Sequence, residues 1–357
     1  MGSERQAVEL VVARGGWRVP RERSRSRVMT LAGLALAALL QVAAALANDS
    51  TAGLDAGGLK LTFNPDIRME SEDLYLSRDE VRVVYQFHNT SDHDIATLVA
   101  FPLPVMNIGE EGNYALEGRD PVNVMDFQVT VEGKPMEPSV EIKATRFGVD
   151  VTDVLKRYDV PLTMLAPGEG AGNALSDRLD NLPEDARKEL ERYGVIDWNT
   201  TFGAEDKSLA NTHWDTQITF YWLQTFPAGR TIEVKHRYKP VPRHFFFAKD
   251  DLASPETQKL FCLDQAFTSA AQTAMKQSSQ DMLAGYELKY VLMTAGNWLG
   301  PIQKFRLTVE KPSEQALVSL CAEGIKRESA STFTLSADDY VPNGDLNVLF
   351  VEPLPKL

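Results

Sequence analysis

The amino-acid sequence predicts a mainly β protein, an antiparallel β-sandwich assembly with an α-helical insertion. Short segments with alternating apolar and polar residues recur along most of the chain, as expected for half-buried strands. Helical spacing appears mainly within residues 148–205 and in a stretch that contains Cys262. Proline, glycine and asparagine separate these segments, which is typical of turns between strands.

Residues 80–104 carry the clearest strand pattern. Val81, Val83 and Tyr85 alternate with polar residues, so one face of this segment is predicted to be buried. A polar run from residue 89 to 94 is rich in turn formers, and an apolar run of strand length follows until Pro102. We therefore predict a hairpin, with the later strands forming the layer against which it packs.

The predicted parts follow in order. Residues 48–147 form an N-terminal β-sandwich part, with further strands near 59–63, 67–69, 125–132 and 140–144. Residues 148–205 form the α-helical insertion, with helices that start near Asp150 and Ser176. Residues 206–245 form a β-hairpin that completes the sandwich. Residues 246–357 form a C-terminal part with a helix, further strands and the cysteine pair.

Residues 1–47 have the pattern of a signal peptide with a basic n-region. Five arginines between residues 18 and 27 precede an apolar run that ends in Ala45-Leu46-Ala47, a small-x-small cleavage site. Cleavage after Ala47 would make Asn48 the first residue of a periplasmic or secreted protein. An uncleaved single-span anchor is the alternative, because residues 30–47 are about the minimum length for crossing a bilayer.

Charge excludes some classes of partner. The chain has a formal net charge of −13, and residues 1–47 contribute seven arginines and three glutamates, so the remainder carries −13 − 4 = −17. Such an acidic body repels nucleic acid. No apolar run after residue 47 reaches spanning length, so no stable membrane span is expected after cleavage.

The two cysteines, Cys262 and Cys321, are predicted to form a disulfide. An even pair in an exported chain indicates oxidation, with two separately buried thiols as the alternative. The pair has no Cys-x-x-Cys or His-x-x-x-His companion, and the five histidines lack ligand spacing. We therefore expect no metal site and no cofactor.

Catalytic signals are weak in this sequence. It contains no Gly-x-Ser-x-Gly elbow, and the glycine-rich run 168–172 does not follow a strand. Paired carboxylates are the remaining candidates, with Glu72 as a weak candidate catalytic residue. Solvated loops explain most acidic clusters in so acidic a chain.

Three aromatic residues near predicted strand ends form a candidate binding surface: Tyr221, Trp222 and Trp298. Aromatic side chains are enriched at binding interfaces. The alternative is that they fill the ends of the sandwich.

Several short segments together resemble a secreted bacterial family, the domain of unknown function 4424. They are the Asn48-Asp49-Ser50 start, residues 71–74, residues 97–104, Tyr221-Trp222 with Phe226-Pro227, and residues 296–302. The resemblance covers nearly all of the chain after residue 47 and implies no activity; it places Glu72 at an acidic position. A fainter similarity, through Phe101-Pro102 and residues 127–133, links the chain to the vault and inter-alpha-trypsin β-sandwich domain.

We expect from these patterns a non-catalytic envelope or extracellular module that binds a protein or glycan partner. The alternative, from a different class, is an envelope hydrolase that uses paired carboxylates.

Overall fold

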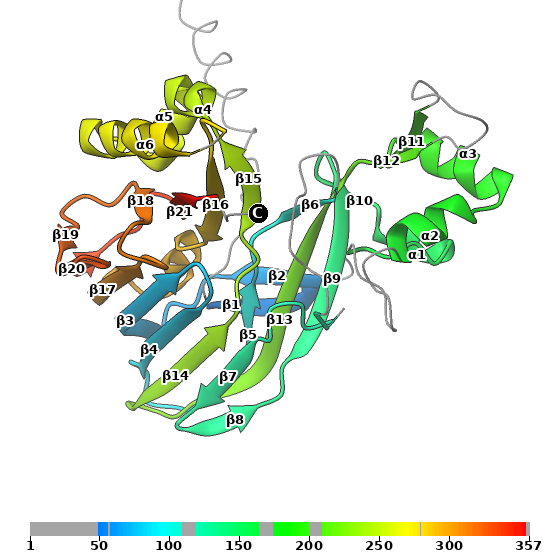
Figure 1. The fold of residues 1–357 in the computed structure, drawn as a ribbon. Helices are drawn as coiled ribbons and strands as arrows, with labels where there is room; N and C mark the ends of the chain where they lie inside the picture. The colour runs from blue at the N-terminus through cyan, green and yellow to red at the C-terminus, as the bar shows by residue number, and fades with distance from the viewer. Residues whose placement is uncertain are drawn as a thin grey trace, which may run out of the picture. The chain divides into compact units, whose positions relative to one another are not determined.

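The structure is a computed structural model, and it describes residues 49–55, 58–108, 119–120, 122–163, 174–199, 209–278 and 280–354. Most of these residues lie in strands, and the helices are short (Figure 1). The predicted fold class, mainly β with sandwich-like packing, is confirmed. The predicted signal segment, residues 1–47, lies outside the described residues.

The first sheet contains the N-terminal strand of the described chain. Its strands run in the order β10 (Val149–Asp150), β9 (Ser139–Arg146), β13 (Trp214–Phe226), β5 (Ile95–Pro102), β1 (Ser50–Asp55) and β2 (Gly58–Thr62), and β6 (Met106–Ile108) also pairs with β13. Every pairing in this sheet is antiparallel.

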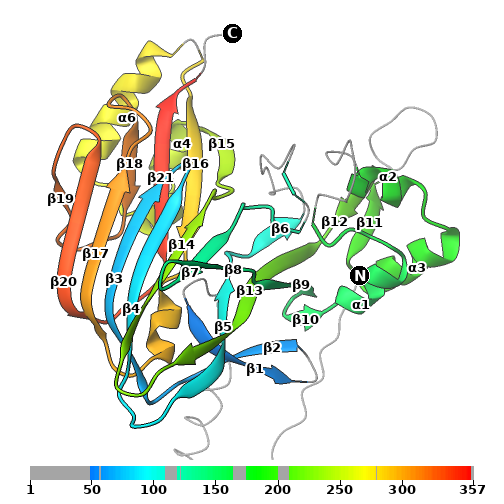
Figure 2. The ribbon, with the colours of Figure 1, turned by 90° about the horizontal axis from the view of Figure 1, so that it is seen from below.

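The second sheet has eight strands in the described part of the chain (Figure 2). Their order is β19 (Lys326–Arg327), β20 (Thr332–Tyr340), β17 (Ile302–Glu310), β3 (Ile67–Ser77), β4 (Val81–Asn89), β14 (Thr231–Tyr238), β7 (Gln128–Val131) and β8 (Lys134–Met136). Strands β17 and β3 are parallel, and the other neighbours are antiparallel.

A third sheet and a small ribbon complete the β structure. The third sheet has the order β15 (Arg243–Phe247), β16 (Leu283–Tyr290), β21 (Leu346–Pro353) and β18 (Leu317–Leu320). The ribbon pairs β11 (Ile196–Asn199) with β12 (Leu209–Thr212).

Helices occur in the two regions where helical spacing predicted them. Within 148–205 lie α1 (Thr152–Arg157), α2 (Ala174–Asp180) and α3 (Glu184–Arg192), together with β10 and β11. Between β15 and β16 of the third sheet lie α4 (Lys249–Ala253), α5 (Pro255–Phe261) and α6 (Gln265–Gln277), and the 3₁₀ helix η2 (Met293–Asn297) follows β16. Phe267, Ala271 and Met275 of α6 are buried with Leu283 and Val351 of the third sheet in a separate small core.

The predicted hairpin in residues 80–104 is wrong, although both of its strands form. Strand β4 belongs to the second sheet and β5 to the first, so the turn between them is a corner between layers. Strands β13 and β14, predicted as a hairpin in 206–245, are separated in the same way. The two corners are joined because Asn89 Nδ2 donates hydrogen bonds to the carbonyls of His93 and Phe226, 2.8 and 2.9 Å away.

This exchange has a physical reason. Strand β5 pairs with β13 in one sheet, and β4 pairs with β14 in the other. Each polar turn therefore carries the chain from one sheet to the other. The strands of residues 80–104 pair with the strands of residues 206–245 and not with each other. The strands on either side of residues 296–301 also lie in different sheets, β16 in the third and β17 in the second.

Cys262 and Cys321 form a disulfide that joins the end of α5 to the residue after β18. Replacing both cysteines by serine is expected to lower the free energy of unfolding by about 3 kcal/mol, because a cross-link over 59 residues restricts the unfolded chain. Urea unfolding of the double variant and of the oxidised parent measures this difference. An unchanged midpoint and slope would contradict the expectation.

Candidate functional site

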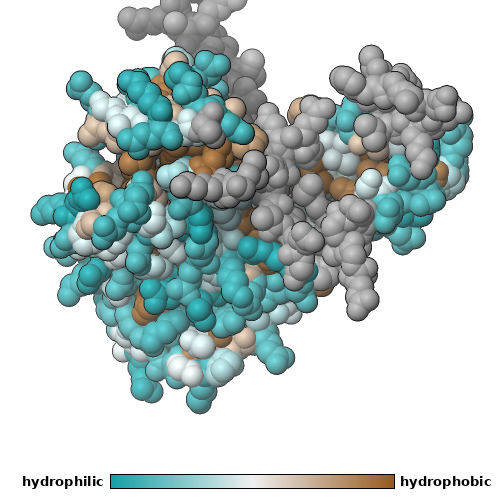
Figure 3. Space-filling view, viewed as in Figure 1, coloured by the Kyte–Doolittle hydropathy of each residue, from teal (hydrophilic) through white to brown (hydrophobic). Residues whose placement is uncertain are grey.

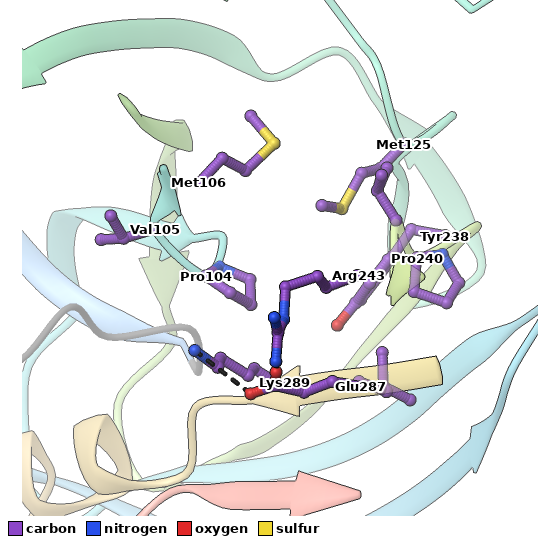
Figure 4. A pocket seen from close by; sticks show the side chains of 11 residues that line it. Pro104, Val105, Met106, Met125, Tyr238, Pro240, Arg243, Glu287 and Lys289 are labelled. Atoms are coloured by element: carbon purple, nitrogen blue, oxygen red, sulfur yellow. Dashed lines mark hydrogen bonds and ion pairs between the residues drawn. The ribbon is translucent and has the colours of Figure 1, made fainter. Parts of the chain in front are cut away.

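A narrow crevice lies where segments from all three sheets or their connections meet (Figure 4). Its interior volume is about 40 Å³. This is room for a few non-hydrogen atoms, since one water needs roughly 10–15 Å³ by the same measure. Its walls come from the β5–β6 connection, Met125, the end of β14, the β14–β15 connection, β15 and β16, and its apolar members are Pro104, Val105, Met106, Met125, Pro240, Val241 and Leu288.

Three charged side chains lie on one side of this crevice. Glu287 of β16 has only 4% of its side chain exposed, and Arg243 Nε donates a 2.9 Å hydrogen bond to it. Lys289 Nζ lies 3.3 Å from the other carboxylate oxygen. The β15–β16 register places Arg243 opposite Glu287, and the period of two places Lys289 on the same face. The three groups together carry a charge of +1.

Tyr238, near the end of β14, supplies a buried hydroxyl group. Only 2% of the residue is exposed, and its hydroxyl makes no hydrogen bond with any described residue. Figure 4 shows this hydroxyl directed into the crevice, on the side of Arg243. Burial raises the pKa of Tyr238, so the phenol stays protonated and can donate a hydrogen bond. A buried donor of this kind is costly unless a ligand or water accepts from it.

Arg119 braces the rim of the crevice. Its guanidinium donates to the carbonyls of Val124, Lys239 and Pro240, at 3.0, 3.0 and 3.2 Å. Two of these carbonyls belong to the connection that follows Tyr238, and the third precedes Met125. The rim is therefore held by hydrogen bonds from one side chain to three backbone carbonyls, as expected for a preformed site.

A second group of polar residues is sealed inside the core. Asp49 and Glu72 are fully buried, and so are Tyr85 and Tyr290. The Tyr290 hydroxyl donates to Glu72 Oε1 at 3.2 Å and lies 3.0 Å from the Tyr85 hydroxyl. Strands β3 and β4 of the second sheet and β16 of the third supply these side chains, so the network links two sheets.

His236 of β14 lies beside Asp49, with its Nε2 atom 3.5 Å from Asp49 Oδ2. The histidine ring is in contact with the rings of Tyr85, Phe101, Phe127 and Trp222, with centroids 4.8–5.5 Å apart. Burial lowers the pKa of His236 to about 3. Burial, and then repulsion from Glu72, raises the pKa of Asp49 well above 3.8. Both shifts favour the neutral forms of the two groups over an ion pair.

The carboxyl groups of this cluster are closed off from solvent. Glu72 and Asp49 have no exposed surface, whereas a general acid or base must come within hydrogen-bonding distance of its substrate. Among the described residues, no group of three or more histidine, cysteine, aspartate and glutamate side chains is placed to hold a metal ion. No described helix is both long and apolar enough to span a bilayer.

The family model for a domain of unknown function, DUF4424, matches residues 47–349. This match covers most of the chain. The protein belongs to the DUF4424 family. The family resemblance expected from the sequence is thus confirmed. No match was found among curated proteins.

Two solved structures are distantly similar to this DUF4424 protein. One is a crystal structure from Legionella pneumophila subsp. pneumophila str. Philadelphia 1, given as a candidate nutrient binding protein; it is 15% identical, with a TM-score of 0.42, and the match covers 86% of this chain and 70% of the other. The second is an M1 zinc metallopeptidase from Deinococcus radiodurans, 8% identical, with a TM-score of 0.25, over 81% of this chain and 43% of the other.

Of the three aromatic residues predicted as a binding surface in this DUF4424 protein, the two tryptophans are buried. Trp298 is 1% exposed and Trp222 is 4% exposed, whereas Tyr221 is half-buried. Trp298 Nε1 donates a 2.7 Å hydrogen bond to the Asp49 carbonyl. Both tryptophans are therefore buried, and they present no shared exposed face.

Sequence reasoning missed the crevice. Its charged residues lie on two strands that are about forty positions apart in the chain, and Tyr238 reads as an ordinary strand residue. The only local signal is the Glu287–Lys289 pair, in which opposite charges share one strand face. Pro240 and Val241, in the connection that follows β14, also form part of the wall.

Proposed function

We propose that this protein is an exported, non-catalytic binding module whose ligand site is the crevice beside Tyr238. The observation that carries the proposal is the buried Tyr238 hydroxyl, which is directed into a space lined by apolar walls and three charged groups. A mostly apolar cavity with a few convergent polar groups is the usual form of a small binding site.

The size of the crevice defines what a partner can insert. A volume of about 40 Å³ is far below the roughly 300–1,000 Å³ of sites that enclose a whole drug-sized ligand. A small solute fits, and so does a terminal group of a protein or glycan partner. On the face seen in Figure 3, outside the grey atoms, hydrophilic residues predominate, which favours local insertion over a broad apolar contact.

The rival function, an envelope hydrolase with paired carboxylates, has less support. It needs two acids in contact with substrate, whereas Glu72 and Asp49 are fully buried. Turnover of peptidoglycan fragments or polysaccharide that disappears in Glu72→Gln would overturn the binding proposal in favour of this one.

Native mass spectrometry of protein purified without dialysis tests the site. We expect an added small-molecule mass, or capture of an envelope component, that is lost when Val105→Trp fills the crevice. Val105 is only partly buried, so this variant should fold, which its thermal unfolding will show. The same substitution at the exposed Val122 is the matched control. Binding that Val105→Trp leaves unchanged would place the site elsewhere.

Export is tested separately by N-terminal sequencing of protein from the periplasm or medium. The expected first residue is Asn48. A chain that keeps residues 1–47 and remains with the membrane fraction would support the anchor alternative.

A further inference from the structure

We infer that the crevice binds a carboxylate carried on a short aliphatic chain. This inference rests on the proposed binding function and names the chemical class that the site selects. The carboxylate would lie between Tyr238, Arg243 and Lys289, and the aliphatic carbons would lie between Met106 and Met125. The ligand can be a free small acid or the C-terminal residue of a peptide, because both offer the same group.

Charge selects the sign of the ligand. Arg243 and Lys289 face the crevice with the single carboxylate of Glu287, which leaves one positive charge beside an otherwise apolar space. A cationic ligand would meet two like charges there. Arg243 uses Nε for Glu287, and a guanidinium has two further nitrogens that can donate to a second carboxylate.

The buried hydroxyl selects an acceptor. Tyr238 can only gain a good hydrogen bond in the crevice from an acceptor, since its phenol is held protonated by burial. A hydrogen bond from a neutral donor to an ionised acceptor is among the strong ones. An alcohol could also accept this bond, but it would leave the positive charge uncompensated.

The walls and the volume select a short aliphatic tail. Met106 and Met125 are 3% exposed and line opposite sides of the crevice in Figure 4. Methionine side chains adapt to small apolar groups. A sugar ring would bring several hydroxyl groups against these apolar walls, where their hydrogen bonds with water would be lost.

The test is calorimetric titration of the full exported chain with matched five-carbon probes. Valerate is expected to bind, whereas 1-pentanol and pentylamine are expected to bind at least about tenfold more weakly. A short peptide that ends in a free valine carboxylate, compared with the same peptide as its C-terminal amide, distinguishes a chain end from a free acid. Tighter binding of the acid peptide than of valerate identifies the chain end as the preferred source.

Two variants separate the roles of the residues. Tyr238→Phe is expected to weaken valerate binding by about tenfold without lowering the melting temperature, because the hydroxyl has no partner among the described residues. Lys289→Gln is expected to weaken it and to reduce its dependence on salt. Lys249→Gln, the same change at an exposed lysine that pairs with Asp281, is the control and should bind valerate normally.

The outcomes are distinguishable. Equal binding of valerate and pentanol, or preference for pentylamine, would overturn the carboxylate assignment while leaving a working crevice. Unchanged valerate affinity in Tyr238→Phe and Lys289→Gln would also overturn it. If the small-molecule or partner binding seen by mass spectrometry is insensitive to Val105→Trp, the proposed function at this site fails as well.

Discussion

Replacing Trp298 by alanine is expected to lower the free energy of unfolding by about 4 kcal/mol, close to the upper end for large-to-small changes in a core. The side chain is 1% exposed and packs on Phe87 and Phe226, with ring centroids 4.6 and 6.0 Å away. Its indole nitrogen also donates to the Asp49 carbonyl, which secures the segment that enters β1. The variant loses both the packing and this hydrogen bond.

Urea unfolding measures this loss of stability. One further variant separates the packing from the hydrogen bond, and a second provides a comparison at a less buried position. Trp298→Phe keeps part of the packing but has no donor, so it should lie between alanine and the parent. Tyr221→Ala, at a half-buried position on β13, should cost clearly less. If Trp298→Ala instead has parental stability and loses binding to an envelope partner, the aromatic binding surface predicted from the sequence would be supported.

This contrast shows what the sequence could predict about aromatic residues. A tryptophan in a Gly-Asn-Trp-Leu-Gly-Pro loop has the same local signature whether it faces a partner or the core. Here the η2 turn brings Trp298 beneath the start of β1, and Asn297 Nδ2 also donates to Ser50 Oγ at 2.8 Å. The deciding contacts lie almost 250 positions away in the chain, so no window of residues contains them.

Strand positions were more predictable than strand partners. The alternation in 81–88 and 232–238 is a property of each segment, and both segments form strands. Pairing depends on whether a turn folds back in its own sheet or crosses to another layer. The same polar residues serve both purposes, and the crossing becomes visible only in the strand pairing and in the hydrogen bonds of Asn89 to His93 and Phe226.

The crevice is the least predictable feature for the same reason. Tyr238, Arg243 and Glu287 become neighbours only after the second and third sheets have assembled. Glu72 illustrates the opposite error, because an acidic residue in a charged run was expected in solvent or in a cleft. It lies in a long strand and is fully buried, with the Tyr290 hydroxyl as a partner.

Asp49 and His236 are expected to give an unusual dependence of stability on pH. The pKa of His236 is lowered from 6.5 to about 3, so this group alone would make the protein lose stability as the pH falls from 6.5 towards 3. The pKa of Asp49 is raised from 3.8, so this group alone would make the protein lose stability as the pH rises above 3.8. The two effects have opposite signs where their ranges overlap.

In that overlap, folding transfers a proton within the pair rather than taking one from solvent. Between about pH 4 and 6.5 the unfolded chain holds its proton on His236, because Asp49 is then ionised. Burial raises the pKa of Asp49 and so favours a proton on its carboxyl in the folded chain, where His236 is neutral. At every pH in this range where folded Asp49 keeps that proton, the two states bind equal numbers of protons at this pair, so its contribution to stability should be independent of pH.

Asp49→Asn removes the titration of Asp49 and leaves the opposing effect of His236 uncompensated. In the variant, His236 alone titrates, and the free energy of unfolding should rise relative to the parent by about 1.4 kcal/mol per pH unit near pH 4.5, with the slope falling to about half that value at pH 6.5, where the unfolded histidine is half protonated. Urea unfolding of both proteins at four pH values in this range gives the difference curve, in which other titrating groups cancel. Adding His236→Gln to the variant should abolish its extra slope. Parallel curves for parent and Asp49→Asn would contradict a protonated Asp49 in the folded protein.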